Sequence, residues 1–292
     1  MTQNIIIGGV EVTNPDKIIF AGKPPVKKAD VVNYYYSAAS AMLPYIKGRV
    51  LSIVRCPKGV SSPCFFKKHP DVNGKGVEKL PVKNSEGQEE EYFYIKNEKG
   101  LLYEAQMGTV EFHLWGSRAQ NIEKPDLMVF DLDPDEGMSL DRVRRGVRDL
   151  KSLLDGLSLT SFLKTSGGKG YHIVLPFKPS AEWEAFRDFA KKIAQAMEYN
   201  WQDLYTCNVR KEKRKGKIYI DWVRNGRGAT SVSPYSLRAR KGLSVSMPIA
   251  WEELDVTAPD SFNIKNAPDR IKSHDAWQGF FAVKQRLKAF KN

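Results

Sequence analysis

The middle of the chain alternates between short apolar runs and stretches in which apolar residues recur every three or four positions. Four runs have the length and composition of buried strands: 126–133, 160–166, 171–176 and 217–223. Two stretches between them, each beginning at a capping serine (Ser139 and Ser180), have one apolar face, as helices packed on a sheet do. The order strand, helix, strand, strand, helix, strand predicts the split βαβ unit of ferredoxin-like folds. In that topology the first strand lies between the third and the fourth.

The flanking parts of the chain follow less regular patterns. Upstream, we expect a strand in IIIGGVEV and a helix that is capped by Asp30 and ends near Pro44. Further strands are expected in the runs VLSIV, CFF, YFYI, LLYEA and TVEFH, with the acidic stretch 84–91 as a hairpin tip. Beyond Ser273, aromatic and apolar residues at helical spacing predict a final helix: Trp277, Phe280, Phe281, Leu287 and Phe290.

The length of 292 residues allows one large domain or two small ones. We expect a single α/β (α+β) domain over 1–292. Its parts are an N-terminal mixed β/α part (1–125), the βαββαβ unit (126–245) and a C-terminal segment ending in a helix (246–292). No apolar run approaches the ~20 residues that span a bilayer. The N-terminus also lacks the features of a secretory signal, so we expect a cytoplasmic protein.

The chain is strongly basic. Lysine and arginine number 46 against 34 acidic residues, which gives a formal net charge of +12. Such an excess favours polyanionic partners, because each phosphate contact releases condensed counterions. A solvated basic surface explains the excess equally well, so the charge suggests a partner and does not identify a reaction.

The three cysteines are Cys56, Cys64 and Cys207. Their odd number and the absence of a C-x-x-C pair argue against a disulfide framework and fit a reducing compartment. Together with His69 they could hold zinc, but their irregular spacing favours small buried thiols.

Three aspartates end or interrupt the predicted strands. Asp131 and Asp133 are two residues apart on the first strand, so their side chains point to the same face. Asp221 interrupts the apolar run of the fourth strand, which the topology places beside the first. Carboxylates that converge on one face repel each other unless they hold cations, and hard oxygen ligands suit Mg²⁺ or Mn²⁺. Two such ions about 3.5–4 Å apart would activate an attacking hydroxyl and stabilise a leaving pyrophosphate.

Each aspartate also has a structural interpretation. The D-x-D pair is followed by proline and can mark a strand end and its turn. Asp221 can be one half of a buried ion pair, with Arg224 as the other half. The convergence of all three carboxylates favours a metal site over these alternatives.

A glycine-rich turn, SGGKG, joins the second and third predicted strands and precedes His172. Glycines let the backbone approach a ligand closely, and successive N–H groups can cradle a phosphate. Ser166 and Lys169 would add a hydroxyl and a positive charge. The spacing is not that of a Walker A loop. An ordinary hairpin is the alternative, but beside three acids the turn is interpreted as a triphosphate site. Further candidates for phosphate contact are His113, Arg224, Arg227, Arg238 and Arg240.

The motifs DLDP, SGGKGYH and YIDWVRNGRG occur together in this order. In this combination the chain resembles the polymerase domain of bacterial and archaeal DNA ligase D, a member of the archaeo-eukaryotic primase superfamily. The resemblance covers nearly the whole chain, from TNPDK to the last expected helix, and the combination is far more specific than any single motif. It implies a primase-like fold and a nucleotidyltransferase of non-homologous end joining, which fills gaps, extends ends and often prefers ribonucleotides.

The resemblance also implies roles for individual residues. The expected metal ligands are Asp131, Asp133 and Asp221. The nucleotide-binding positions are His113, Ser166, Lys169, His172 and Arg238. The positions similar to a pocket for a downstream 5′-phosphate are Asn14, Lys17 and Lys28. The positions similar to template contacts are Phe65, Phe66 and Arg214, although the two aromatic residues could equally be core.

The resemblance implies cofactors and partners as well. Two divalent ions, Mn²⁺ or Mg²⁺, are the expected cofactors. The expected partners are DNA that is gapped, nicked or broken and carries a 5′-phosphate, nucleoside triphosphates (NTP or dNTP), and Ku with a separate or fused DNA ligase. Such a protein would work at the nucleoid. A replicative-type primase, a metal-dependent nuclease and a non-catalytic DNA-binding module are the alternative functions.

Overall fold

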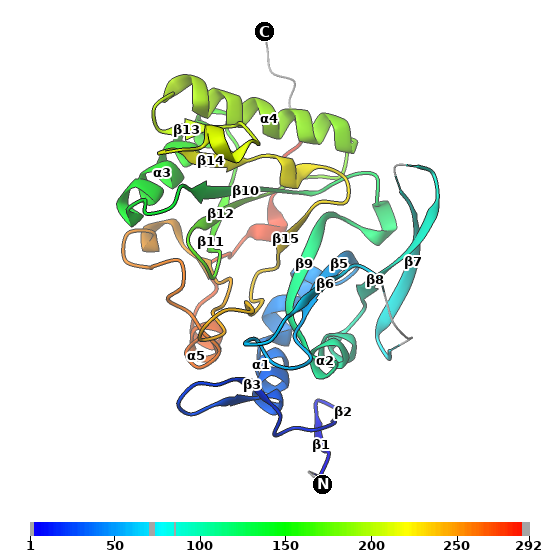
Figure 1. Cartoon of the computed structure of the whole chain (residues 1–292). Coiled ribbons are helices and arrows are strands. Elements are labelled where there is room, and N and C mark those ends of the chain that lie inside the picture. Colours follow the sequence, from blue (N-terminus) through cyan, green and yellow to red (C-terminus); the bar gives the residue numbers. More distant parts are fainter. Residues whose placement is uncertain (1–2, 70–73, 85, 288–292) are drawn as a thin grey trace. The chain divides into compact units, whose positions relative to one another are not determined.

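The computed structural model describes residues 3–69, 74–84 and 86–287, which form two compact units (Figure 1). Unit 1 comprises the described residues within Met1–Leu114, Val232–Met247 and Phe262–His274. Unit 2 comprises those within Trp115–Ser231, Pro248–Ser261 and Asp275–Asn292. The chain therefore passes repeatedly from one unit to the other. That the two units act as a single domain stays a prediction.

Unit 2 is built on a sheet with the predicted strand order. Its six strands run β13–β14–β10–β12–β11–β16. The four predicted strands are β10 (Leu127–Pro134), β11 (Phe162–Thr165), β12 (Tyr171–Pro176) and β14 (Ile218–Asp221). β10 pairs antiparallel with both β12 and β14, so the first strand does lie between the third and the fourth, as predicted. The short strands β13 (Tyr205–Thr206) and β16 (Pro248–Ile249) extend the two edges.

Two helices determine which face of this sheet carries polar residues. α3 (Leu140–Gly156) and α4 (Trp183–Asn200) contact each other, and both contact β10. Gly146 of α3 lies so close to the sheet that a Cβ there would be 3.0 Å from Ile218 and 3.2 Å from Leu132. Leu132 therefore faces α3. Because side chains alternate along a strand, the neighbouring positions 131 and 133 face the opposite side.

Unit 1 contains most of a second sheet, ordered β15–β9–β5–β8–β7, with β6 also paired to β5. Its strands are β5 (Arg49–Arg55), β6 (Phe65–Lys67), β7 (Val77–Lys83), β8 (Glu89–Ile95), β9 (Thr109–Arg118) and β15 (Thr230–Val232), of which β9 and β15 continue into unit 2. β7 and β8 form the predicted hairpin. The hairpins β1–β2 (Ile5–Ile7, Val10–Val12) and β3–β4 (Ile18–Phe20, Val26–Lys27) precede α1 (Lys28–Ile46).

In unit 1, the predicted cap of the first helix and one predicted strand are wrong. α1 begins at Lys28, and Asp30 lies in its first turn, where its carboxylate accepts a hydrogen bond from the Lys27 N–H at 2.7 Å. The helix continues through Pro44 to Ile46. The run LLYEA is not a strand but part of α2 (Glu98–Gln106). Asn97 starts this helix by accepting a hydrogen bond from the Gly100 N–H, so a local capping contact outweighs the strand propensity of the run.

Two helix predictions in unit 2 are also wrong. α4 begins at Trp183 after Glu182, while the Ser180 hydroxyl donates to the Lys178 carbonyl instead of capping the helix. After α5 (Ala267–Ser273), the described residues 274–287 form no α-helix, only a 3₁₀ turn at Phe280–Ala282. Gly279, with a φ of 83°, has the left-handed conformation that interrupts a helix.

The C-terminal aromatic residues pack against unit 2 without forming a helix. Trp277 and Phe280 stack on each other, and both contact Phe162 of β11. The Trp277 indole also donates to the Leu163 carbonyl at 2.7 Å. The aromatic spacing therefore reflects this packing contact. Phe290, the last apolar position of the expected helix, lies outside the described residues.

Cys56 and Cys64 form a disulfide, contrary to the expectation of free thiols, and Cys207 is free. The pair joins the end of β5 to the start of β6, which are themselves paired between Arg55 and Phe65. The two sulfur atoms meet because these strands are adjacent, which the spacing of the cysteines does not reveal. Among the described residues, no helix combines the length and apolar character required to cross a membrane.

Candidate active site

Four polar side chains form one row across the sheet of unit 2. Asp131 of β10 lies directly opposite Asp221 of β14 on one side and His172 of β12 on the other. His172 in turn lies opposite Lys164 of β11. Residues directly opposite in an antiparallel sheet share a face, so all four lie on the side away from α3. The structure thus brings Asp131 and Asp221 together as the topology predicted.

Asp133 lies on the same face, two residue pairs further along the strands. It is opposite Tyr219 of β14, and its side chain is 65% exposed. Arg214 stacks on the Tyr219 ring, with its guanidinium carbon 3.6 Å from the ring centroid, and its Nη1 is 3.7 Å from Asp133 Oδ2. Asp133 is therefore the solvent-exposed member of the three, whereas Asp131 and Asp221 are each only 17% exposed.

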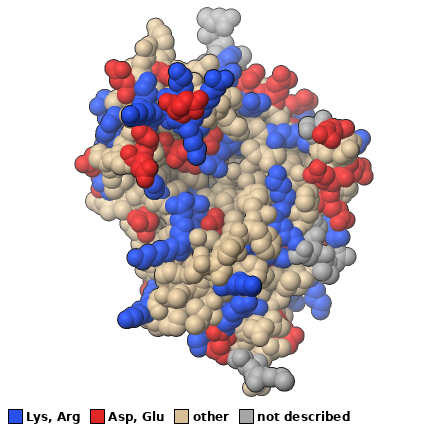
Figure 2. Space-filling view, in the orientation of Figure 1, with Lys and Arg blue, Asp and Glu red and all other residues tan. Residues whose placement is uncertain are grey.

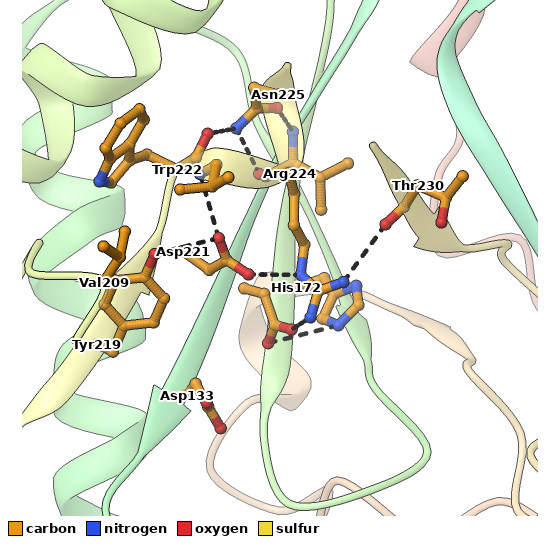
Figure 3. A network of polar contacts seen from close by, with 12 residues as sticks. Asp133, His172, Val209, Tyr219, Asp221, Trp222, Arg224, Asn225 and Thr230 are labelled. Carbon is orange, nitrogen blue, oxygen red and sulfur yellow. Dashed lines mark hydrogen bonds and ion pairs between the residues drawn. The ribbon is translucent and has the colours of Figure 1, made fainter. Parts of the chain in front are cut away.

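Arg224 links the two less exposed aspartates. Its Nη2 lies 2.9 Å from Asp131 Oδ2, and its Nε lies 2.9 Å from Asp221 Oδ2. Its Nη1 also donates to the Thr230 carbonyl at 3.3 Å. Figure 3 shows the guanidinium reaching Asp221 while Asp133 stands apart from these contacts. The ion pair that the sequence offered as the structural alternative for Asp221 is therefore present.

The charges of this carboxylate centre (Asp131, Asp133 and Asp221) are not balanced by Arg224 alone. Burial raises the pKa of Asp131, Arg224 opposes that rise, and the other two carboxylates add to it. Burial also disfavours the charge on Arg224, but the three carboxylates outweigh this effect and raise its pKa. A centre with this excess of hard oxygen donors fits a divalent cation such as Mg²⁺ or Mn²⁺.

The arrangement of the centre is nevertheless that of an arginine-paired site. Among the described residues, no group of three or more His, Cys, Asp or Glu side chains is positioned to hold a metal ion. Asp131 and Asp221 direct oxygens to Arg224, and Asp133 stands apart (Figure 3). The donor chemistry of the three carboxylates suits a divalent ion, whereas in this structure Asp131 and Asp221 are paired with Arg224.

His172 is buried and oriented by a buried lysine. The Lys164 Nζ lies 3.0 Å from His172 Nδ1, and Lys164 is only 1% exposed. Since a lysine ammonium can only donate, Nδ1 accepts, which we infer leaves the ring proton on Nε2. Nε2 lies 3.5 Å from Asp131 Oδ1. The ring is thus directed at the carboxylate centre, and the contact with the incoming triphosphate that the resemblance implies for His172 stays a prediction.

The glycine-rich turn is held by its own serine. Ser166 Oγ accepts hydrogen bonds from the N–H groups of Gly168 and Gly170, at 3.1 and 3.3 Å. A Cβ on Gly170 would lie 2.7 Å from the Leu132 carbonyl oxygen, so glycine allows the turn to pack against β10. Lys169 is exposed at the tip. The turn therefore places Lys169 next to the strand that carries Asp131 and Asp133.

Two other predicted nucleotide contacts, His113 and Arg238, lie in unit 1 and share Glu111. Its Oε2 is 2.8 Å from His113 Nε2 and 3.0 Å from Arg238 Nε, and its Oε1 accepts from the Ala239 N–H at 2.7 Å. Burial alone would raise the pKa of Glu111, but these partners lower it to about 2. Glu111 therefore stays ionised and fixes both side chains.

The expected 5′-phosphate residues are adjacent in unit 1. The Lys17 N–H donates to the Asn14 carbonyl, and the Lys28 N–H donates to the Lys17 carbonyl, which joins the three residues through their backbones. The Lys28 ammonium donates to the Thr13 carbonyl at 2.7 Å and to Gln106 at 3.2 Å. Burial and the nearby charge of Lys17 lower the pKa of Lys28. Binding of a 5′-phosphate by these three residues stays a prediction.

The predicted template contacts are exposed aromatic residues rather than core. Phe65 and Phe66 lie on β6 and are 47% and 50% exposed. The Phe66 ring contacts His113 edge-on, with 5.7 Å between centroids. Exposure of two neighbouring phenylalanines is costly unless they bind a partner, and nucleic-acid bases are suitable stacking partners.

Comparison with known families identifies the chain. Residues 27–277 match the family model described as the LigD primase-polymerase domain. The chain belongs to this family. LigD primase-polymerase domains are nucleotidyltransferases that act on DNA, so the enzyme class and the primase-like fold expected from the motifs are confirmed.

Individual relatives agree with this assignment. The multifunctional non-homologous end joining protein LigD of Pseudomonas aeruginosa is 33% identical over 288 residues, 96% of this chain and 34% of that protein. The bifunctional non-homologous end joining protein LigD of Bacillus subtilis is 30% identical over 266 residues, 90% of this chain and 42% of that protein. The chain therefore spans less than half of either LigD protein.

A solved structure is also similar. The polymerase domain from Mycobacterium tuberculosis Ligase D in complex with DNA has a TM-score of 0.86 and 29% sequence identity to this chain. The match covers 94% of this chain and 99% of the mycobacterial one. The agreement over almost the whole length confirms the LigD polymerase fold.

Sequence reasoning missed Lys164 and Glu111. Lys164 is in a strand read as apolar, and only the register of β11 with β12 places it beside His172. Glu111 had a signal, because positions 111 and 113 alternate onto one face of β9. Its contact with Arg238, however, joins residues 127 positions apart and depends on the fold.

Proposed function

We propose that this chain adds nucleotides to DNA 3′ ends, directed by a template strand, during repair of double-strand breaks by non-homologous end joining. The observation that best supports this proposal is the pairing of Asp131 with Asp221 across β10 and β14. Asp133 lies on the same face, and the chain is a LigD primase-polymerase domain. The end-joining names of the relatives and the DNA complex of the mycobacterial neighbour support the proposed substrate and pathway.

Asp131, Asp133 and Asp221 would hold two divalent ions, Mn²⁺ or Mg²⁺. When bound, such ions acidify a primer 3′-hydroxyl and neutralise the leaving pyrophosphate. His172, which Lys164 orients, would keep Asp131 in position through its Nε2–H. This arrangement orients the reacting groups before chemistry, which is the main contribution a protein makes to phosphoryl transfer.

The incoming nucleotide would be bound by charged and hydroxyl groups. Lys169 presents its charge at the tip of the turn that Ser166 stabilises. Arg238 and His113, both anchored by Glu111, would contact the nucleotide with fixed geometry. Preference for ribonucleotides would need a contact to the 2′-hydroxyl.

DNA would be bound through its phosphates and its bases. Asn14, Lys17 and Lys28 would bind the 5′-phosphate downstream of a gap, and this contact would set the register. The template strand would contact Phe65 and Phe66 by stacking and Arg214 by charge. Ku and a DNA ligase are the proposed partners, and the nucleoid in the cytoplasm is the proposed location.

Extension of a gapped duplex tests the reaction. We expect wild-type protein with Mn²⁺ to lengthen a labelled primer, with ribonucleotides used more readily than deoxyribonucleotides. Asp131→Asn should reduce the rate of primer extension by more than roughly 10–100-fold. That range is typical for substitution of residues that only hydrogen-bond to metal ligands. Asp141→Asn is the matched control, because this α3 side chain is 91% exposed.

The same assay separates the alternatives. A shortened primer would indicate a nuclease, and products made without any primer would indicate a replicative-type primase. DNA that is bound but left unchanged, with binding unaffected by Asp131→Asn, would indicate a binding module. Extension that Asp131→Asn leaves intact would refute the proposed centre.

A second comparison tests recognition of the downstream end. The Lys17→Ala, Lys28→Ala double variant should extend primers on gaps without a 5′-phosphate as wild type does. It should lose the stimulation that a 5′-phosphate gives wild type. Equal stimulation of both proteins would contradict the assignment of these lysines.

A further inference from the structure

Arg224 occupies the positions that a cation would need. Besides the hydrogen bond to the Thr230 carbonyl, its contacts include Asp131 Oδ2 and Asp221 Oδ2, each at 2.9 Å. These oxygens face each other across paired strands, so an ion that bridges them must replace the guanidinium. A guanidinium and a divalent ion cannot both lie there, because their charges repel and their volumes overlap.

The backbone beside Arg224 is fixed independently of its side chain. Arg224 lies in the 3₁₀ turn Val223–Asn225 after β14. The next residue, Asn225, accepts from the Val129 N–H at 2.7 Å and donates to the Val129 carbonyl at 2.9 Å. These two bonds attach the turn to β10, as Figure 3 illustrates for Asn225. The Arg224 side chain can therefore change position without movement of the strands.

The side-chain contacts of Arg224 are of a kind that can exchange. The side chain is 36% exposed, so water can reach it. Its Nε lies near Asp221 but is not aligned as a hydrogen-bond donor to it, which leaves an ion pair without directional bonding. At this contact Arg224 therefore lacks the paired directional bonds of a bidentate arginine–carboxylate fork.

We propose that Arg224 is the resident counterion of the carboxylate centre and leaves Asp131 and Asp221 when divalent ions bind there. The proposal rests on the proposed function, since it requires that these carboxylates take metal. Arg224 prevents repulsion between the carboxylates in the metal-free protein. It thereby weakens metal binding and couples metal occupancy to the position of one side chain.

Titration with Mn²⁺ in the absence of nucleotide and DNA tests this role. Free Mn²⁺ is followed by electron paramagnetic resonance for wild type, Arg224→Gln and Arg227→Gln. Arg227→Gln is the matched control: it removes the same charge three residues away, where the guanidinium pairs with Glu123 at 2.7 Å. We expect Arg224→Gln to bind Mn²⁺ about tenfold more tightly than wild type, since one charged contact no longer competes. Arg227→Gln should match wild type.

Thermal unfolding provides a second readout. In EDTA, Arg224→Gln should unfold at a lower temperature than wild type and Arg227→Gln, because the carboxylates lose their counterion. Mn²⁺ should raise the unfolding temperature of Arg224→Gln more than that of wild type. If Arg224→Gln does not fold, Arg224→Lys replaces it. Lysine keeps one charge but cannot contact both carboxylates through a planar fork, so its Mn²⁺ affinity should also exceed that of wild type.

The outcomes separate this inference from the proposed function. If Arg224→Gln binds Mn²⁺ no more tightly than wild type, and Asp131→Asn abolishes binding, the metal site stands and the counterion role is wrong. If Asp131→Asn leaves Mn²⁺ binding unchanged, both in wild type and combined with Arg224→Gln, the assignment of the metal site is wrong. If Arg227→Gln also binds Mn²⁺ more tightly than wild type, the lower net charge explains the effect. The specific role of Arg224 is then wrong.

Discussion

Glu111 joins two side chains that sequence motifs indicate separately. His113 and Arg238 each look like a phosphate contact, yet in the structure both are held by one buried carboxylate that is only 8% exposed. The carboxylate also accepts from the Ala239 N–H, so it orders the backbone after Arg238. A residue without a predicted role thus determines the geometry of two predicted ones.

Replacement of Glu111 should have a pH-dependent effect on stability. The folded-state pKa of Glu111, about 2, lies below its ordinary value of 4.5, so its carboxylate stabilises the fold above pH 4.5. This contribution is lost as pH falls from 4.5 towards 2. At pH 7, Glu111→Gln should lower the free energy of unfolding by up to about 3 kcal/mol, since each pKa unit corresponds to about 1.4 kcal/mol. Urea denaturation at pH 7 and pH 3 measures the difference.

The control for this effect is Glu91→Gln, which removes the same charge from a side chain that is 55% exposed. An exposed ion pair contributes about 0–1 kcal/mol, so this variant should remain close to wild type at both pH values. A constant deficit of Glu111→Gln across the pH range would contradict the assigned pKa and indicate a packing effect alone.

At the scale of elements, the glycine-rich turn and β10 must pack closely for the site to form. Gly170 approaches the Leu132 carbonyl, and the register of β12 with β10 then sets His172 opposite Asp131. β10 is the central element in this arrangement, because it pairs with the strands that carry His172 and Asp221. A displacement of this turn would shift His172 relative to Asp131.

Two glycine-to-alanine variants test the close approach. Gly170→Ala puts a Cβ 2.7 Å from the Leu132 carbonyl oxygen, so we expect a loss of about 1–3 kcal/mol in unfolding free energy. We also expect reduced primer extension. Gly156→Ala, at the end of α3 where a Cβ meets nothing within 4 Å, should stabilise the protein by about 0.5–1 kcal/mol. If denaturant titrations give the same change in unfolding free energy for both variants, the turn can accommodate a Cβ at position 170 without a clash.

At the scale of the whole molecule, the basic residues that give the positive net charge lie among acidic residues on the surface. On the face drawn in Figure 2, Lys and Arg side chains are interspersed with Asp and Glu. The net charge of +12 favours general attraction to DNA, whereas in the proposed function two particular lysines, Lys17 and Lys28, set where the 5′-phosphate binds.

The salt dependence of DNA binding separates the two contributions. For wild type on a gap with a 5′-phosphate, the logarithm of the association constant should fall linearly with the logarithm of salt concentration. The Lys17→Ala, Lys28→Ala variant should reduce the steepness by about two, because roughly one counterion is released per lysine. On a gap without the 5′-phosphate the two proteins should have similar slopes. Fluorescence anisotropy of labelled DNA at salt concentrations from about 50 to 200 mM measures these slopes.

A double variant of exposed lysines is the control for this measurement. Lys83→Ala, Lys96→Ala removes the same charge from unit 1, at the end of β7 and just after β8. It should leave the difference between the two gaps as in wild type. A loss of that difference in the control would attribute phosphate recognition to net charge rather than to Lys17 and Lys28.

The amino-acid sequence by itself determined the central strands, the helices between them and the strand order. Each of these elements buries an apolar stripe with its own period, and short connections leave few ways to pair them. The face shared by Asp131, Asp133 and Asp221 followed from the same periodicity. Helix ends were less well determined: Ser180 looks like a cap but bonds to Lys178, because capping depends on local backbone geometry.

Only the tertiary structure decided which distant residues meet. Arg224 pairs with Asp131, Cys56 bonds to Cys64, and Glu111 holds Arg238, although nothing in local spacing distinguishes these pairs from other combinations. The physical reason is that ion pairs and disulfides depend on positions set by packing of whole elements, whereas hydrophobic periodicity is a property of each segment. The three aspartates and the Asp221–Arg224 pair could therefore be proposed from the chain, whereas the contacts of Arg224 with Asp131 and of Glu111 with Arg238 could not.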